Sequence, residues 1–153
     1  MSAVVPRPLD RRTSLGYQVN YFARLLANTL RNRIELLGVV PGQFAQLLTL
    51  YEEEGLTQRQ LCERVGIEQP TMANTLQRME RDGLIKRLPD PTDGRRAKVM
   101  LTPQARRKEA DLVGAAHDVN AMATAGLDQS EISAFMHTLG KMIENLENQS
   151  AAG

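Results

Sequence analysis

Apolar residues recur every three or four positions along most of the chain, which is the spacing of one face of an α-helix. The first run extends from Thr13 to about Leu37 and ends at Gly38. A second run begins at Pro41, a residue that the first turn of a helix tolerates, and similar runs continue to about residue 147. The pattern therefore predicts a mainly helical protein.

Two of the predicted helices are short and are joined by a tight turn. Thr57 and Gln60 have the spacing of a capping box at the start of the first helix. Gly66 ends that helix, and Pro70 opens the next one. A helix, a turn of three or four residues with glycine, and a second helix make a helix-turn-helix.

The second of these helices, within IEQPTMANTLQRMERDGLI at residues 67–85, has two contrasting faces. Met72, Leu76 and Met79 share one face and predict a buried seam. Another face carries short polar side chains and one arginine: Thr71, Asn74, Thr75 and Arg78. Because threonine and asparagine are weak helix formers, this composition favours a face that lies close against a polar partner.

Two short apolar runs, LIKRL at 84–88 and AKVML at 97–101, flank a turn rich in Asp, Gly and Pro. They predict a β-hairpin, in which Gly94 can adopt the positive φ that a tight turn needs. A hairpin directly after a helix-turn-helix makes a winged helix. The predicted fold class is therefore mainly α with a small β-hairpin wing, the winged helix-turn-helix being flanked by N- and C-terminal helices.

Two more helices are predicted after the wing. Thr102 and Pro103 start the first, which ends near Gly126, and Asp128 caps the second. The first and last helices of the chain are longer than a winged helix needs, so we expect their apolar faces to pack against a second copy, the alternative being a monomeric bundle. The expected division is a flexible arm (1–12), an N-terminal dimerisation helix (13–40), the winged helix-turn-helix (41–102), C-terminal dimerisation helices (103–147) and a frayed tail (148–153).

Charge is unevenly distributed along the chain, although the net charge is only +1. Residues 57–108 hold twelve Lys and Arg against six Asp and Glu, a net charge of +6. Residues 109–153 hold one Lys against seven Asp and Glu, a net charge of −6. A basic excess on a helix-turn-helix indicates a polyanion as partner, whereas the alternative is an uneven surface without one.

The second helix of the pair has the side chains expected of a DNA-reading helix. Asn74 and Gln69 can each pair bidentately with adenine, and threonine methyl groups can contact thymine. Pro70 presents an apolar ring at the entry point, and Arg78, one turn further on, suits a phosphate. The predicted contacts here are Gln69, Pro70, Thr71, Asn74, Thr75 and Arg78, the alternative being an ordinary solvated surface.

The predicted hairpin tip carries Arg95 and Arg96, which can enter the minor groove, where the negative potential is enhanced. Asp93 is expected to orient Arg95 and to start the turn. The candidates for phosphate contacts outside the tip are Lys86, Arg87, Arg106 and Arg107.

The stretch LTQRQLCERVGIEQPTMANTLQRMERDGLIKRLPDPTDGRRAKVMLT, residues 56–102, resembles the winged helix of the multiple antibiotic resistance regulator (MarR) family. The order of helices over residues 13–147 is similar to that family's. The resemblance implies a homodimeric regulator, in many members a repressor, which binds a pseudo-palindromic operator in double-stranded DNA and releases it on binding a small aromatic or phenolic ligand. The family's wing is often D-x-R-D-x-R; Asp90, Asp93 and Arg95 match it, but Thr92 replaces the first arginine.

Candidate sensor residues are fewer. By the resemblance, a ligand pocket lies between the first helices and the winged helix, near Tyr17, Tyr21, Phe44 and Tyr51, with core packing as the alternative. Cys62, the single cysteine, is expected to pack in the core, the alternative being a redox switch activated by Arg59 or Arg64.

Other classes of function are disfavoured. His117 and His137 have no metal-ligand spacing, and no nucleophile elbow or phosphate-binding glycine loop is present, so neither an enzyme, a cofactor nor a metal is expected. No apolar run approaches a membrane span, no secretory signal is recognisable, and one cysteine suits a reducing cytoplasm. A winged helix that binds protein instead of DNA is the remaining alternative.

Overall fold

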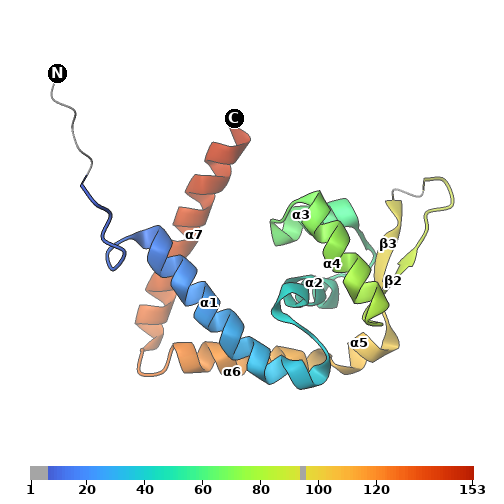
Figure 1. Cartoon of the computed structure of the whole chain (residues 1–153), viewed down its shortest axis with the longest axis horizontal. Helices are drawn as coiled ribbons and strands as arrows, with labels where there is room; N and C mark the ends of the chain where they lie inside the picture. Colours follow the sequence, from blue (N-terminus) through green and yellow to red (C-terminus); the bar gives the residue numbers. More distant parts are fainter. Residues whose placement is uncertain (1–6, 94–95) are drawn as a thin grey trace. The chain divides into compact units, whose positions relative to one another are not determined.

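The computed structural model describes residues 7–93 and 96–153, which fall into two compact units divided after Val119. The first unit begins with α1 (Leu15–Ile34), followed by a short 3₁₀ turn, η1 (Glu35–Leu37) (Figure 1). The helix predicted over residues 13–37 is thus confirmed. It starts after Ser14, whose hydroxyl caps it, and the chain leaves it at Gly38, where φ is +73°.

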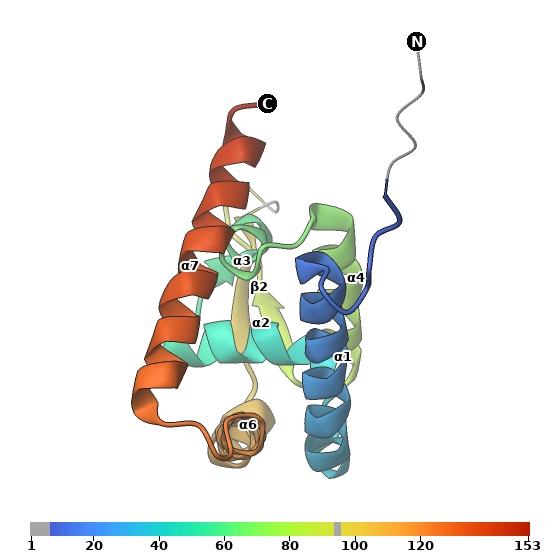
Figure 2. The same ribbon diagram turned by 90° about the vertical axis from the view of Figure 1, so that its left-hand side faces the viewer.

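Helix α2 (Pro41–Glu52) lies across the middle of this unit (Figure 2). Its buried side chains include Phe44, Leu47 and Leu50, the last two fully inaccessible. The predicted helix from Pro41 is confirmed. The core around α2 has few aromatic side chains; it includes Ile34, Leu61, Met72, Leu76, Met79, Leu84, Ile85, Val99, Leu101 and Leu112.

The predicted helix-turn-helix is confirmed as α3 (Gln58–Val65) and α4 (Gln69–Arg81). The capping box forms as expected: the Gln60 N–H donates to the Thr57 hydroxyl (3.2 Å), and the Thr57 N–H donates to the Gln60 side chain (2.9 Å). Gly66 ends α3 with a φ of +75°, a conformation that strongly favours glycine.

The predicted hairpin is also confirmed, with β2 (Ile85–Leu88) antiparallel to β3 (Lys98–Leu101). A third strand, β1 (Leu56–Thr57), pairs with the other edge of β3, so the order is β1-β3-β2. Two residues are too few to show an alternating pattern, which is why the sequence did not predict β1.

After the wing the sequence predicted one helix from Pro103 to near Gly126, and this prediction is wrong. The structure has α5 (Pro103–Arg107) and then α6 (Glu109–Ala123). The Tyr51 hydroxyl donates to the Ala105 carbonyl (2.7 Å), an acceptor that an unbroken helix would give to the N–H of residue 109. The Lys108 N–H instead closes a tighter turn on Ala105 (3.2 Å).

The second unit, residues 120–153, contains the end of α6 and the last helix, α7 (Gln129–Ala151). The predicted cap is confirmed, since the Glu131 N–H donates to the Asp128 carboxylate (2.8 Å). The frayed tail predicted at 148–153 is wrong for residues 148–151, because α7 continues to Ala151.

No single helix in residues 7–93 and 96–153 combines the length and apolar composition of a membrane span; only Leu15–Leu37 with Pro41–Glu52, bent by 75°, meets those criteria jointly.

Candidate nucleic-acid interface

Helix α4 has the two faces that its sequence predicts. Met72, Leu76 and Met79 are fully buried against the core. On the polar face of the helix Thr71, Asn74 and Arg78 are exposed, whereas Thr75 is half-buried. The Thr75 hydroxyl donates to the Thr71 carbonyl (2.9 Å), which fixes its rotamer and points its methyl group away from that bond. The exposed face therefore offers amide, hydroxyl and guanidinium groups on a rigid helix.

A shallow hollow of about 470 Å³ follows this face along the helix, lined by Asn74, Gln77, Arg78 and Arg81. The first and third residues were predicted as contacts, whereas the other two were not. Gln77 and Arg81 could have been predicted from the sequence, because they stand three and seven positions after Asn74 and so share its face of the helix. The polar face therefore extends to the last turn of α4.

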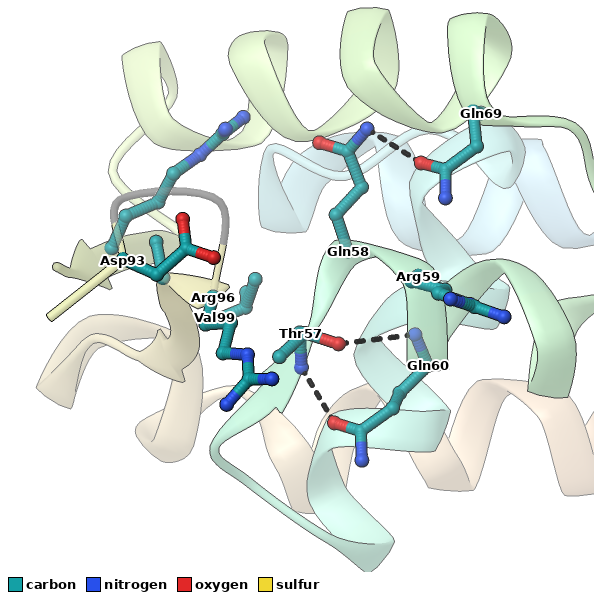
Figure 3. A pocket seen from close by; sticks show the side chains of 10 residues that line it. Thr57, Gln58, Arg59, Gln60, Gln69, Asp93, Arg96 and Val99 are labelled. Carbon is teal, nitrogen blue, oxygen red and sulfur yellow. Dashed lines mark hydrogen bonds between the residues drawn. The ribbon is translucent and has the colours of Figure 1, made fainter. Parts of the chain in front are cut away.

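A larger groove of about 770 Å³ separates the start of α3 and α4 from the wing (Figure 3). Its lining holds three arginines and one aspartate, a net charge of +2: Arg59, Arg87, Arg96 and Asp93, together with Thr57, Gln58, Gln60, Gln69, Ala97 and Val99. Arg59 forms an ion pair with Glu63 (3.3 Å), and Arg87 forms one with Glu80 (3.3 Å). Two of the three arginines that line the groove are thus ion-paired with acidic neighbours.

Gln69 and Pro70 are exposed at the start of α4, beside this groove. Pro70 is in the first turn, where its missing N–H leaves no helical hydrogen bond unmade. The Gln69 side chain accepts a hydrogen bond from the Gln58 amide (2.9 Å). Sequence reasoning did not select Gln58, because nothing local to it indicates that it lies beside the next helix.

Thr92 stands in the wing at the position where the pattern it resembles often has arginine. Asp90 accepts two hydrogen bonds from Thr92, one from its N–H (2.8 Å) and one from its hydroxyl (2.7 Å). These bonds hold the pKa of Asp90 below its ordinary value. Thr92 therefore supplies two local hydrogen bonds to the Asp90 carboxylate.

At the tip, the Arg96 N–H donates to the Asp93 carbonyl (3.0 Å), so Asp93 takes part in the turn as predicted. Arg96 and Asp93 both line the groove. Gly94 and Arg95 lie outside the described residues, so the minor-groove contact of Arg95 stays a prediction.

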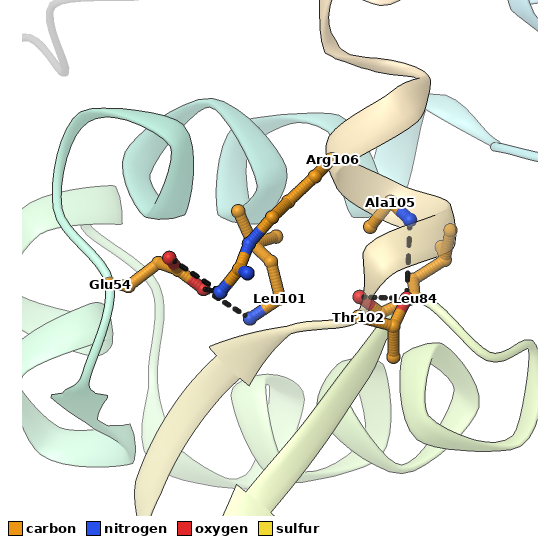
Figure 4. A network of polar contacts seen from close by, with 6 residues as sticks. All are labelled: Glu54, Leu84, Leu101, Thr102, Ala105 and Arg106. Atoms are coloured by element: carbon orange, nitrogen blue, oxygen red, sulfur yellow. Dashed lines mark hydrogen bonds and ion pairs between the residues drawn. The ribbon is translucent and has the colours of Figure 1, made fainter.

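The phosphate candidates outside the tip fall into different settings. Lys86 on β2 and Arg107 on α5 are exposed. Arg106 is exposed too, but its guanidinium donates to both carboxylate oxygens of Glu54 (2.7 and 2.9 Å), so a phosphate would compete with this ion pair (Figure 4). Glu54 also accepts the Leu101 N–H (2.8 Å), so this pair joins α5 and the end of β3 to the chain that follows α2.

Cys62 is buried in the core, as predicted. Burial raises the pKa of its thiol, and the nearby Glu63 carboxylate raises it further. The two arginines of the redox alternative are engaged with acids, Arg59 with Glu63 and Arg64 with Glu53. This environment opposes thiolate formation and so disfavours that alternative.

The four aromatic residues of the expected pocket do not gather in either of the pockets described above. Phe44 is buried in the core, and the Tyr51 hydroxyl is bound to Ala105. Tyr17 and Tyr21 are exposed on α1, at 41% and 47% of their surface. Phe44 and Tyr51 therefore agree with the packing alternative.

His117 and His137 are both exposed, on α6 and α7. Within the described parts of the chain, no cluster of three or more His, Cys, Asp or Glu side chains has the arrangement of a metal site. The charged and amide groups converge instead on α4 and the groove beside the wing.

Comparisons with known proteins agree with this geometry. The MarR family model matches residues 37–96. The uncharacterized HTH-type transcriptional regulator YwoH of Bacillus subtilis (strain 168) is 30% identical over 98 residues, covering 64% of this chain and 71% of that protein.

Two solved structures share the fold over nearly their full length. A MarR transcriptional regulator from Methanosarcina mazei Go1 has a TM-score of 0.81 at 27% identity, covering 88% of this chain and 96% of that one. The PcaV transcriptional regulator from Streptomyces coelicolor, solved in complex with its natural ligand, has a TM-score of 0.77 at 28% identity, covering 91% and 98%. The chain is thus a transcriptional regulator of the MarR family.

Proposed function

We propose that this regulator binds double-stranded DNA as a homodimer, with α4 of each copy in a major groove and the wing at the flanking minor groove. The observation that carries the proposal is the exposed Thr71, Asn74 and Arg78 face of α4 beside a groove lined by Arg59 and Arg96. A helix of this kind fits the major groove, where base edges are distinguishable.

The contacts follow from the side-chain chemistry. Asn74 pairs with an adenine through its amide, and Thr71 and Thr75 present methyl groups to thymine. Arg78 and Lys86 suit phosphates, Arg96 suits the minor groove or its backbone, and Arg95, which lies outside the described residues, is proposed to join it. Base contacts then set sequence preference, and phosphate contacts set the register on the duplex.

A homodimer is supported by the apolar side chains that single helices leave uncovered. Leu15 on α1 is 60% exposed, and Phe135 and Leu146 on α7 are 52% and 71% exposed. Contact of so much apolar surface with water is unfavourable, and a second copy of the chain would cover it in a two-fold dimer. Two copies would place two recognition helices on a pseudo-palindromic operator.

We further propose that the protein is a repressor released by a small aromatic or phenolic ligand. The PcaV structure with its natural ligand supports ligand response in a relative of similar fold. Of the four aromatic residues predicted for the pocket, Tyr17 and Tyr21 on α1 are exposed and available to such a ligand, whereas Phe44 and Tyr51 would need to give up their packing.

Affinity measured against salt concentration tests DNA binding directly. Neutralising several phosphates per copy releases counterions, so affinity for a selected duplex should fall roughly 10³- to 10⁵-fold between about 50 and 200 mM salt if six to ten phosphates are contacted. The duplex is obtained by selection from random sequences, and the titration is repeated with salicylate as phenolic probe. An affinity that does not change with salt concentration would instead favour the alternative in which the winged helix binds a protein.

A further inference from the structure

The side-chain amides of Gln58 and Gln69 are joined by a hydrogen bond at the point where α3 and α4 approach each other (Figure 3). Each glutamine is the first residue of its helix, and the two lie 11 positions apart in the chain. The Gln58 Nε2 donates to the Gln69 Oε1 at 2.9 Å. Both side chains line the groove between the helix-turn-helix and the wing.

This hydrogen bond restricts a side chain that would otherwise be mobile. Gln69 is exposed, and a glutamine has three rotatable side-chain bonds, so fixing it carries a large loss of rotamer freedom. Gln58 is half-buried and follows directly on the Thr57 cap, which anchors its backbone. Gln58, the more buried of the two, therefore restricts the side chain of the more exposed Gln69.

The direction of the bond fixes the orientation of the Gln69 amide, with its Oε1 toward the Gln58 Nε2. One lone pair of its Oε1 is used, which leaves a second lone pair and both hydrogens of its Nε2. An acceptor beside a donor is the pattern that complements adenine, which presents N6–H₂ and N7 in the major groove. Guanine presents two acceptors there, N7 and O6, and so matches this amide less well.

We infer that Gln58 is a positioning residue for base selection, because it holds the Gln69 amide in the orientation that accepts from and donates to adenine. This inference rests on the proposed function, and it adds a residue outside the recognition helix to the determinants of sequence preference. The two glutamines then act as one unit at one base pair per half-site.

The test measures base preference and not only affinity. Binding of the wild type, Gln58→Ala, Gln69→Ala and the double variant is titrated on the selected duplex and on duplexes changed at each base pair. The wild type should prefer adenine at one position by roughly 5- to 150-fold. Gln69→Ala should abolish that preference, Gln58→Ala should lower it by at least about twofold, and the double variant should match Gln69→Ala.

Gln58→Glu provides a second variant that should fold well, because an acidic residue is favourable in the first turn of α3, which has none. Its carboxylate accepts from the Gln69 Nε2 instead of donating to Oε1, so adenine preference should again fall at the same position. Arg59→Ala, on the same helix and groove, is the control and should weaken binding to all duplexes alike.

The outcomes separate the two proposals. A wild type that binds every duplex alike would refute sequence-specific binding itself. A wild type that discriminates, combined with unchanged adenine preference in both Gln58 variants or with additive effects of the two alanine changes, would overturn only the role of Gln58.

Discussion

The Arg106 guanidinium lies 2.7 and 2.9 Å from the two carboxylate oxygens of Glu54, although the residues are 52 positions apart. The same carboxylate accepts the N–H of Leu101, the last residue of β3. Glu54 therefore connects the wing strand to α5, the helix through which the chain leaves the winged helix. Arg106, which the sequence suggested as a phosphate contact, thus forms an ion pair that connects α5 to the chain after α2.

We expect Glu54→Gln to lower the free energy of unfolding by about 1 kcal/mol at pH 7, since both partners are partly exposed and solvent weakens the pair. Burial alone would raise the pKa of Glu54, but hydrogen bonds from Arg106 and Leu101 outweigh burial and lower the pKa below its ordinary value. A lowered pKa stabilises the fold above the unfolded value, and that stabilisation is lost as pH falls through the folded pKa. Urea unfolding at pH 7 and at successively lower pH should show the difference between the two proteins shrinking below about pH 4.5; a difference independent of pH would contradict the assignment.

Tyr51→Phe removes the hydrogen bond that interrupts the helix between α5 and α6. The expected loss is about 1 kcal/mol, or about 2–4 °C in melting temperature. Tyr17→Phe, whose side chain is exposed, should melt like the wild type. Burial, and secondarily Glu109, raise the pKa of Tyr51 to about 12, so its contribution should be complete below about pH 10 and should disappear as pH rises through 12. Equal melting temperatures for both variants would show that the bond is unimportant.

Asn74→Ala is expected to weaken binding to the selected duplex by about 1–3 kcal/mol and to relax base preference at one position per half-site. The reason is the loss of a bidentate amide contact on the exposed face of α4. Asn32→Ala, an equally exposed change on α1, serves as the control in the same gel-shift titration. If Asn74→Ala binds the duplex as tightly as the control does, α4 does not contact the bases as proposed.

Leu146→Asp should convert the proposed homodimer to a monomer at micromolar concentration, because it places a charge in apolar surface that the second copy covers. Asn145→Asp adds the same charge at the neighbouring exposed position and should leave the dimer intact. Sedimentation velocity distinguishes the two masses. A wild type that sediments as one copy would remove the basis for a two-fold operator.

Cys62 should react slowly with a thiol reagent at pH 7, because burial and Glu63 raise its pKa and only the thiolate attacks. The labelling rate should continue to rise with pH above the pH range in which an ordinary thiol ionises. Cys62→Ala should leave the response of DNA binding to peroxide unchanged. Rapid labelling at pH 7, together with peroxide-induced release that the variant lacks, would restore the redox alternative.

The local elements of the fold were predictable from the sequence because each depends on residues at most four positions apart. The buried seam of α4, the capping boxes at Thr57 and Asp128, and the turn at Gly66 are all of this kind. The same periodicity was enough to place Asn74 and Arg78 together on the polar face of that helix. Family resemblance, carried by the wing and the helix-turn-helix together, then identified the class of protein.

By itself, then, the sequence determined the order of the helices, the winged helix and the polar face of α4, because periodicity and caps act within one or two turns. Only the tertiary structure decided the break between α5 and α6, the engagement of Arg106 and the pairing of Gln58 with Gln69. Their partners lie 54, 52 and 11 positions away, respectively. Such contacts form only when packing of the core brings distant side chains together, and no local pattern encodes the partner.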